Sequence, residues 1–182
     1  MNKAIKSFLA VGAVAFLAAC GNNQSTGSTG HEGHDHAQAE EVSKPAANVS
    51  LKDDKLNAVY QHYIHLTTAL TNSDPSEAKV AAAAIEAGAK EVEGASTVAG
   101  AAAKISSAAN IEAQRKELSE LSNEFISLVK KSGLNSGEVY VEYCPMALND
   151  EGAYWLSNSK EIRNPYFGES MLTCGEVKET LN

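Results

Sequence analysis

The sequence predicts a mainly α protein: an antiparallel helical bundle with a small, aromatic-rich cap, irregular or β in structure, at the C-terminus. Between residues 51 and 133, apolar residues recur at alternating spacings of three and four, which is the period of an amphipathic helix. The connections between these segments are short, which favours antiparallel neighbours. After Gly133 the pattern changes to the alternation of a strand, and aromatic residues become frequent.

The first helix is expected from Leu51 to the Asn72-Ser73-Asp74 segment. Its apolar stripe consists of Leu56, Val59, Tyr63, Leu66 and Leu70. A second helix is expected to begin after Asp74, because this residue suits an N-cap and Pro75 suits the first helical position. It should run to about Val92.

Residues 98–107 predict a short helix, and a strong helix is expected from about Asn110 to Lys131. Gly133 suits the position after a helix C-terminus, where a left-handed backbone is common. In the cap, residues 139–144 predict a strand, and residues 153–156 are its expected partner. Residues 164–168 predict a turn.

The chain is acidic, with a formal net charge of −8 over 182 residues. It contains no cluster of Lys or Arg, which argues against nucleic acid as a partner. Glycine-rich phosphate-binding motifs and the G-x-S-x-G motif are absent from the sequence. No nucleophile–base pair can be argued from spacing, so we expect a binding protein and no enzyme.

Residues 1–19 are typical of a signal peptide. Lys3 and Lys6 precede an apolar run of 13 residues, Ser7–Ala19, which is shorter than the roughly 20 residues that span a bilayer. The run ends in Leu17-Ala18-Ala19-Cys20, which closely resembles the lipobox of bacterial lipoproteins. The resemblance implies that Cys20 is acylated and anchors the mature chain to a membrane. The expected location is therefore the bacterial cell envelope, facing the periplasm or the cell exterior. The alternative is an ordinary signal peptide followed by an incidental cysteine.

Residues 20–48 are polar and small, so we interpret them as a flexible tether that precedes a domain over residues 49–182. The tether contains His31, His34 and His36 next to two carboxylates. Such a segment can chelate a divalent metal weakly. The alternative is a solvated polar spacer.

Apart from Cys20, every Cys and Met of the expected mature chain lies in two short segments of the cap. These are Cys144-Pro145-Met146 and Met171-Leu172-Thr173-Cys174. Soft thiolate and thioether ligands favour Cu(I), whereas Met is not a usual zinc ligand. The sequence therefore predicts a Cu(I) site, with another soft or divalent metal as the alternative.

Other interpretations of these segments stay open. A disulfide between Cys144 and Cys174 would close a loop of about 30 residues and contribute about 3–4 kcal/mol in the chain-entropy model. The two methionines could instead fill gaps in the core. His62 borders the apolar stripe of the first helix and is the expected additional metal ligand, whereas His65 lies further toward solvent. A plain surface histidine is the alternative for His62.

The cap also resembles a known family. Its motifs are Val141–Ala147, Gly152–Ser157, Ile162–Gly168 and Met171–Gly175. The chain is similar, over roughly Leu51 to Leu181, to a periplasmic domain-of-unknown-function family. That family occurs as small lipoproteins and fused to adaptor subunits of heavy-metal efflux pumps. The resemblance implies copper or related heavy-metal handling outside the cytoplasm.

Cys144-Pro145-Met146 further resembles the Cys-Pro-Met-His element of metal-binding segments in copper pumps and adaptors. Here Ala147 replaces the histidine, which makes a distant ligand such as His62 more necessary. The leading hypothesis is a lipid-anchored protein that buffers Cu(I) or delivers it to a heavy-metal efflux adaptor. The alternative is a disulfide-stapled helical interaction module of the envelope that holds no metal.

Overall fold

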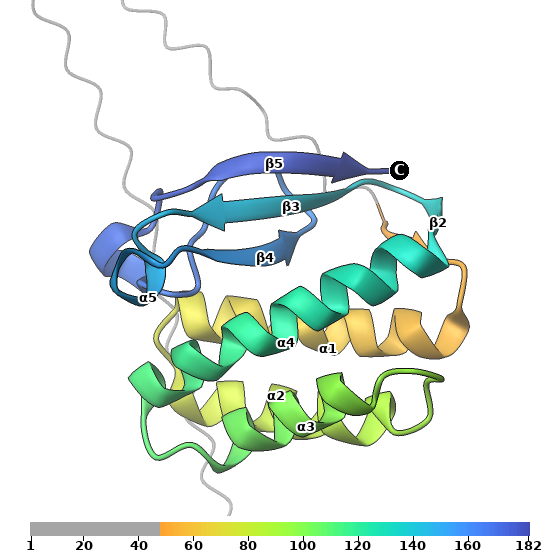
Figure 1. Ribbon diagram of the computed structural model, residues 1–182, viewed down its shortest axis with the longest axis horizontal. Coiled ribbons are helices and arrows are strands. Elements are labelled where there is room, and N and C mark those ends of the chain that lie inside the picture. Colours follow the sequence, from red (N-terminus) through yellow and green to blue (C-terminus); the bar gives the residue numbers. More distant parts are fainter. Residues whose placement is uncertain (1–47) are drawn as a thin grey trace, which may run out of the picture. The chain divides into compact units, whose positions relative to one another are not determined.

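The structure is a computed structural model that describes residues 48–182. The helices α1 (Asp54–Thr71), α2 (Pro75–Ala89), α3 (Ser96–Ser107) and α4 (Ile111–Ser132) pack one against the next in chain order (Figure 1). This arrangement confirms the predicted mainly α fold with a small C-terminal sheet region. Within the described residues, none of the helices combines the length and apolarity needed to cross a lipid bilayer.

Side-chain caps set the helix boundaries. Asp53 accepts a hydrogen bond from the Leu56 backbone N–H at 2.8 Å, so α1 begins later than the expected Leu51. The predicted N-cap Asp74 accepts from the backbone N–H groups of Ser76 and Glu77 at 3.0 and 2.9 Å. Such caps satisfy backbone donors that have no partner inside the helix. Helix α2 ends at Ala89, three residues before the expected end, and the chain then turns toward α3.

Aromatic residues of α1 and α4 occupy the centre of the bundle. The Tyr63 ring stacks on the Phe125 ring with 4.9 Å between their centroids. The Tyr60 ring also stacks on Phe125, with 6.4 Å between those centroids. Helices α2 and α3 contribute mostly buried alanines. At Gly88, an added Cβ would come within 2.9 Å of Val59 Cγ2, so a residue without a side chain permits the close contact between α1 and α2.

The cap is a three-stranded antiparallel sheet in the order β4–β3–β5. The strands are β4 (Ala153–Ser157), β3 (Val139–Cys144) and β5 (Glu176–Leu181). Strands β3 and β4 confirm the predicted pair. Two short strands, β1 (Ser50–Leu51) before α1 and β2 (Leu134–Ser136) after α4, form a separate antiparallel pair. Residues between the long strands form the short element α5 (Ala147–Asp150) and the 3₁₀ helix η1 (Gly168–Met171).

Polar contacts fix the sheet to the bundle. The backbone N–H of Leu156, on the edge strand β4, donates to Tyr63 Oη at 3.1 Å, and Tyr63 Oη also shares a hydrogen bond of 2.7 Å with Ser122 Oγ of α4. On β5, Glu179 forms an ion pair with Lys130 at 2.5 Å. Figure 1 shows the strands above α1 and α4, with β4 drawn nearest to the helices. The buried Tyr63 therefore holds α1, α4 and β4 in one arrangement.

Candidate functional site

The sheet brings the two cysteine segments together. Strand β3 ends at Cys144, and strand β5 begins two residues after Cys174. Tyr143 of β3 pairs with Glu176 of β5, so the chain just after Tyr143 lies opposite the chain just before Glu176. The two thiols lie close enough for Cys144 to raise the pKa of Cys174, and both cysteines are free. The two cysteine segments thus lie side by side at one end of the sheet.

The four sulfur-bearing residues differ in exposure. Cys144 is completely buried, Cys174 and Met171 are half-buried, and Met146 has 48% of its surface exposed. The backbone N–H of Cys174 donates to the Met171 carbonyl at 3.1 Å. The sulfur-bearing residues therefore range from the exposed Met146 to the completely buried Cys144.

The environment of Cys174 disfavours loss of its proton. Its pKa rises to about 11, chiefly because its thiol hydrogen-bonds with Cys144, with further contributions from burial and from the charge of Cys144. The Met146 backbone N–H opposes this with a smaller effect. Two thiols in contact release their protons as a coupled pair, and the second proton is the harder one to remove. A bound cation would remove this penalty, because it neutralises both thiolates.

Trp155 and Asn164 hold the segment that carries Cys174. The Trp155 ring lies so close to Gly175 that a Cβ there would come within 2.9 Å of its Cη2 atom. Asn164 is fully buried; its side-chain N–H donates to the Cys174 carbonyl at 2.7 Å, and its side-chain oxygen accepts from the Tyr166 backbone N–H at 2.8 Å. These contacts fix the backbone around Cys174 before any ligand arrives.

The loop that follows Cys144 has an unusual backbone. Leu148, Asn149 and Asp150 are consecutive left-handed residues, with φ angles of 55°, 59° and 67°. This conformation costs roughly 1–2 kcal/mol for each residue that has a side chain. At the end of the loop, Gly152 also has a positive φ of 79°, and a Cβ there would overlap the Tyr143 hydroxyl. Met146 begins this turn, which is closed by a hydrogen bond of 2.9 Å from the Gly152 backbone N–H to the Ala147 carbonyl.

We expect Gly152→Ala to destabilise the protein by about 3 kcal/mol or more, because the added Cβ meets both the Tyr143 hydroxyl and an unfavourable backbone angle. Urea unfolding followed by circular dichroism measures this loss. Gly100→Ala is the control, because Gly100 lies in α3 with no neighbour within 4 Å of an added Cβ. That change should stabilise by about 0.5–1 kcal/mol. Equal stability of Gly152→Ala and the unmodified protein would contradict the close contact.

His62 does not lie where the sequence analysis placed it. It is exposed on α1, so its expected inward orientation is wrong. Tyr60 and Thr67 are buried in addition to the expected stripe, so the covered face of α1 extends beyond that stripe on the side away from His62. His65 is also exposed and pairs with Glu77 of α2 at 2.8 Å. In residues 48–182, no group of three or more His, Cys, Asp and Glu side chains converges on one point.

Sequence reasoning missed a buried carboxylate next to the cysteine pair. Glu142 is completely buried, and neither of its carboxyl oxygens has a hydrogen-bond partner among the described residues. Burial raises the pKa of Glu142 to about 8, while the nearby indole N–H of Trp155 lowers it by a smaller amount. The alternation of the strand could have indicated this residue, because Glu142 lies on the same face of β3 as Cys144. The structure pairs Glu142 with Trp155 of β4.

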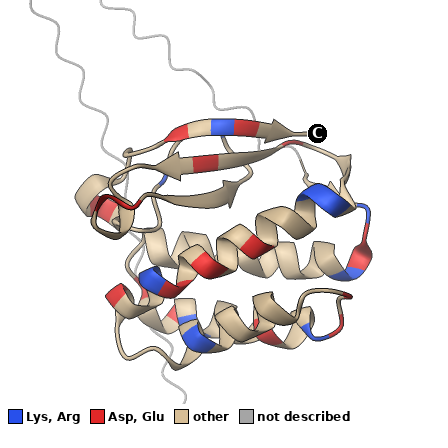
Figure 2. Ribbon diagram, viewed as in Figure 1, with Lys and Arg blue, Asp and Glu red and all other residues tan. Residues whose placement is uncertain are grey.

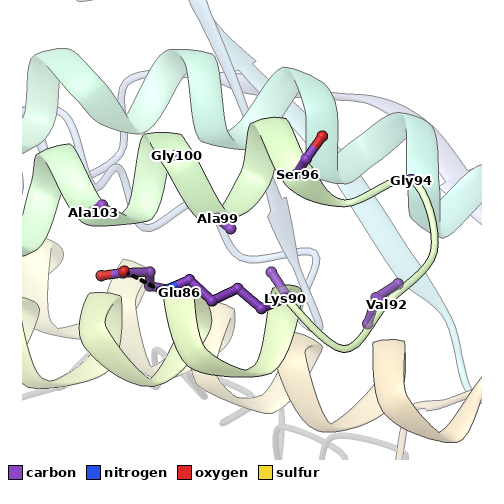
Figure 3. Close-up of a pocket in the computed structure, with 9 residues that line it drawn as sticks. Glu86, Lys90, Val92, Gly94, Ser96, Ala99, Gly100 and Ala103 are labelled. Atoms are coloured by element: carbon purple, nitrogen blue, oxygen red, sulfur yellow. Dashed lines mark hydrogen bonds and ion pairs between the residues drawn. The ribbon is translucent and has the colours of Figure 1, made fainter.

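A shallow groove of about 430 Å³ lies elsewhere, between α2 and α3 (Figure 3). Glu86 and Lys90 pair with each other at 2.7 Å along its wall, as Figure 3 shows. Most of the other residues that line the groove are small, and none of its lining residues is Cys, Met or His. The groove therefore offers no metal-binding chemistry, and the candidate site remains the cysteine pair.

The fold and the site together define a class: a helical-bundle domain whose C-terminal sheet carries two adjacent thiols flanked by two methionines. A family model described as a protein of unknown function (DUF3347) matches residues 59–137. This match covers most of the bundle and ends before β3, and it agrees with the resemblance to a domain-of-unknown-function family. No curated protein and no solved structure matches the chain significantly. The segment expected to be a signal peptide (residues 1–19), Cys20, and His31, His34 and His36 lie outside the described residues.

Proposed function

We propose that this protein is a lipid-anchored, extracytoplasmic metal-binding protein that buffers Cu(I) or delivers it to a heavy-metal efflux adaptor. The observation that carries the proposal is the contact between the Cys144 and Cys174 thiols in a chain whose remaining described sulfur atoms, on Met146 and Met171, lie in the same two segments. Two thiolates and neighbouring thioethers form a soft donor set, which favours Cu(I) over harder divalent ions. The proposed role requires no enzymatic step and no nucleic acid.

The graded exposure of the sulfur atoms suits uptake and release by ligand exchange. Met146 is the most exposed donor, Cys174 is half-buried and Cys144 is buried. Thioethers bind Cu(I) without losing a proton, so Met146 can make the first contact before the thiols release theirs. In the reverse direction, a sulfur ligand of a partner joins the ion at the exposed side before Cys144 lets go. His62 is not part of the proposed ligand set, because among the described residues it forms no metal-binding group with the two cysteines.

Acidic residues on the elements around the cysteine pair favour a cation. Asp150 and Glu151 lie on the loop after β3, Glu169 lies on η1, and Glu176 begins β5. In Figure 2 this loop is coloured as acidic next to the end of β3. All four side chains are exposed, so they act mainly by raising the local concentration of cations, an effect that salt screens.

Competition for Cu(I) tests the proposal. The mature chain is reduced under anaerobic conditions and titrated against a coloured Cu(I) chelator, alongside the Cys144→Ser/Cys174→Ser double variant. We expect the unmodified chain to withdraw one Cu(I) per molecule and the double variant to withdraw none at the same chelator concentration. Full retention of Cu(I) binding by the double variant would overturn the proposed site.

Replacing Cys20 tests the proposed anchor. Two or more acyl chains give stable membrane attachment, so Cys20→Ala should move the protein from the membrane fraction to the soluble fraction. Fractionation and immunoblotting of cells that express either form measure this change. Ser25→Ala, a change in the same polar segment, is the control and should stay membrane-bound. A Cys20→Ala variant that remains in the membrane fraction after washing at high salt would contradict the lipid anchor.

The tether is proposed to have a secondary role. His31, His34 and His36 offer imidazole ligands, which suit divalent ions such as Cu(II) or Zn(II) better than thioethers do. We therefore assign them weak capture of divalent ions, separate from the Cu(I) affinity of the cysteine pair. Because the segment must be ordered to bind, its affinity should be low.

One observation also favours the second candidate function. The same contact between Cys144 and Cys174 permits a structural disulfide, in which case the domain would be a stapled interaction module of the envelope without metal. The two candidates differ in the thiol state of the freshly isolated protein. Two reactive thiols per chain support the metal-binding function, and a disulfide that persists under the reducing conditions of metal loading supports the interaction module.

A further inference from the structure

We infer that Cys144 and Cys174 form a reversible dithiol–disulfide couple, in which Cys174 is the sulfur that exchanges with an external disulfide and Cys144 is the resolving thiol. This inference concerns regulation of the proposed metal site and in that respect rests on the proposed function. It assigns different chemical roles to two cysteines that the donor set alone treats as equivalent.

The first support is the fixed proximity of the two thiols. Pairing of Tyr143 with Glu176 holds the two backbones side by side, and Cys144 is the largest influence on the pKa of the Cys174 thiol. Asn164 adds a hydrogen bond of 2.7 Å to the Cys174 carbonyl. A second thiol held beside a mixed disulfide attacks it rapidly, because the attack is intramolecular. The arrangement therefore favours complete oxidation of the pair over a stable mixed disulfide.

The second support is the difference in access. Cys144 is completely buried at the end of β3, whereas Cys174 is half-buried just before β5. Exchange requires an approach of the external disulfide in line with the attacking sulfur, which a buried thiol does not allow. The Cys174 segment meets solvent at Thr173, which is exposed. Only Cys174 can therefore begin the reaction without opening of the fold.

The reaction balances with a disulfide as oxidant, either a small one such as glutathione disulfide or one on a partner protein. Cys174 first gives up its firmly held proton to solvent, and its thiolate then attacks one sulfur of the external disulfide, whose S–S bond breaks and releases one thiolate. The Cys144 thiolate then attacks Cys174 Sγ, which forms the internal disulfide and releases the second external thiolate. The pair loses two electrons and two protons; the external disulfide gains the electrons, and its two released thiolates take up the protons.

Oxidation of the pair removes both charged ligands from the proposed site. Disulfide sulfur carries no charge and is a poor ligand, so only the Met146 and Met171 thioethers would remain for Cu(I). Conversely, a bound ion engages both thiolates and withdraws them from exchange. Metal loading and oxidation of the pair are thus expected to be mutually exclusive, so metal should protect the thiols and oxidation should release the metal.

Trp155 offers an internal reporter for the couple. It is the single tryptophan of the chain, and its ring packs against Gly175, the residue after Cys174. A change of bonding at Cys174 therefore occurs one residue from the fluorophore. We expect the fluorescence of Trp155 to differ between the dithiol and the disulfide.

The test uses the mature chain, residues 20–182, with Cys20→Ala so that two thiols remain. The apo protein is equilibrated in buffers of reduced and oxidised glutathione, and its thiols are counted by alkylation and mass spectrometry while Trp155 fluorescence is recorded. In parallel, Cys144→Ser and Cys174→Ser single variants are exposed to glutathione disulfide. We expect Cys144→Ser to form a stable mixed disulfide at Cys174 at least about tenfold faster than Cys174→Ser forms one at Cys144.

The outcomes separate this inference from the proposed function. An apo protein that keeps two free thiols in fully oxidised glutathione, or a Cys174→Ser variant that reacts as fast as Cys144→Ser, overturns the couple or its polarity even if Cu(I) binds. A pair that titrates reversibly but takes up no Cu(I) when reduced overturns the proposed function and leaves the couple standing. Thr173→Ala is the control variant and should behave like the parent chain in every measurement.

Discussion

Cys144→Ser and Cys174→Ser are each expected to lower the affinity for Cu(I) by roughly a hundredfold or more, whereas Met146→Leu and Met171→Leu should each lower it by about tenfold or less. The difference arises because a thiolate is a charged donor and a thioether is a neutral, weaker one. The pKa of Cys174 is raised to about 11, so binding must displace a firmly held proton. Affinity should therefore fall as the pH is lowered, and binding should release protons.

Chelator competition at several pH values measures this series. Thr173→Ala, an exposed change between Met171 and Cys174, serves as the matched control and should leave the affinity unchanged. Circular dichroism should show the same helical content for all variants, because most core side chains lie on α1 to α4, whereas Cys144 lies at the end of β3 and Cys174 lies just before β5. Cysteine variants that bind Cu(I) as tightly as the parent would remove the thiols from the site.

The apo protein is expected to lose stability as the pH rises from 5 to 8, and Glu142→Gln should abolish most of this loss. Burial raises the pKa of Glu142 from 4.5 to about 8 in the folded state. Between these values the folded protein keeps a proton that the unfolded chain has released, so raising the pH favours unfolding. Linkage converts this difference into about 3 kcal/mol of lost stability between pH 5 and pH 8.

Urea unfolding of the reduced apo protein at pH 5, 6, 7 and 8 provides the measurement. Glu142→Gln keeps the shape of the side chain without the titration, so its stability should vary less with pH and should exceed that of the parent at pH 8. Glu151→Gln is the control, because Glu151 is exposed in the same cap and should keep the parent's pH dependence. The same slope in Glu142→Gln and the parent would show that the buried carboxyl does not govern the pH response.

Local signals in the sequence predicted the bundle well. The N-cap residues Asp74 and Asn110 and the C-terminal Gly133 mark helix ends by chemistry that acts within one turn, so they can be read without knowledge of the fold. The strand at residues 139–144 and its partner were likewise visible, because alternation reports a half-covered sheet. Helix α1 begins three residues later than expected because Asp53 provides its N-cap.

The parts that the sequence did not predict depend on contacts between distant residues. Strand β5 consists mostly of exposed, charged residues without clear alternation, and only pairing with β3 defines it. That pairing explains why Cys144 and Cys174 meet. His62 was misplaced because the covered face of a helix is set by what packs on it, and a helical period alone leaves its flanks ambiguous. Glu142 was missed because its burial depends on how the sheet packs on the bundle, where its charge acts on Tyr63 of α1.

X-ray absorption at the copper edge, recorded on the Cu(I)-loaded mature chain, tests the central claim most directly. We predict one copper ion per chain bound by sulfur atoms alone. The Cys144→Ser/Cys174→Ser double variant should lose the copper–sulfur contribution to the spectrum. We also predict that deletion of residues 31–36 leaves the spectrum unchanged. Copper bound mainly by nitrogen or oxygen, or a fully reduced chain that takes up no Cu(I), would contradict a metal site at the cysteine pair.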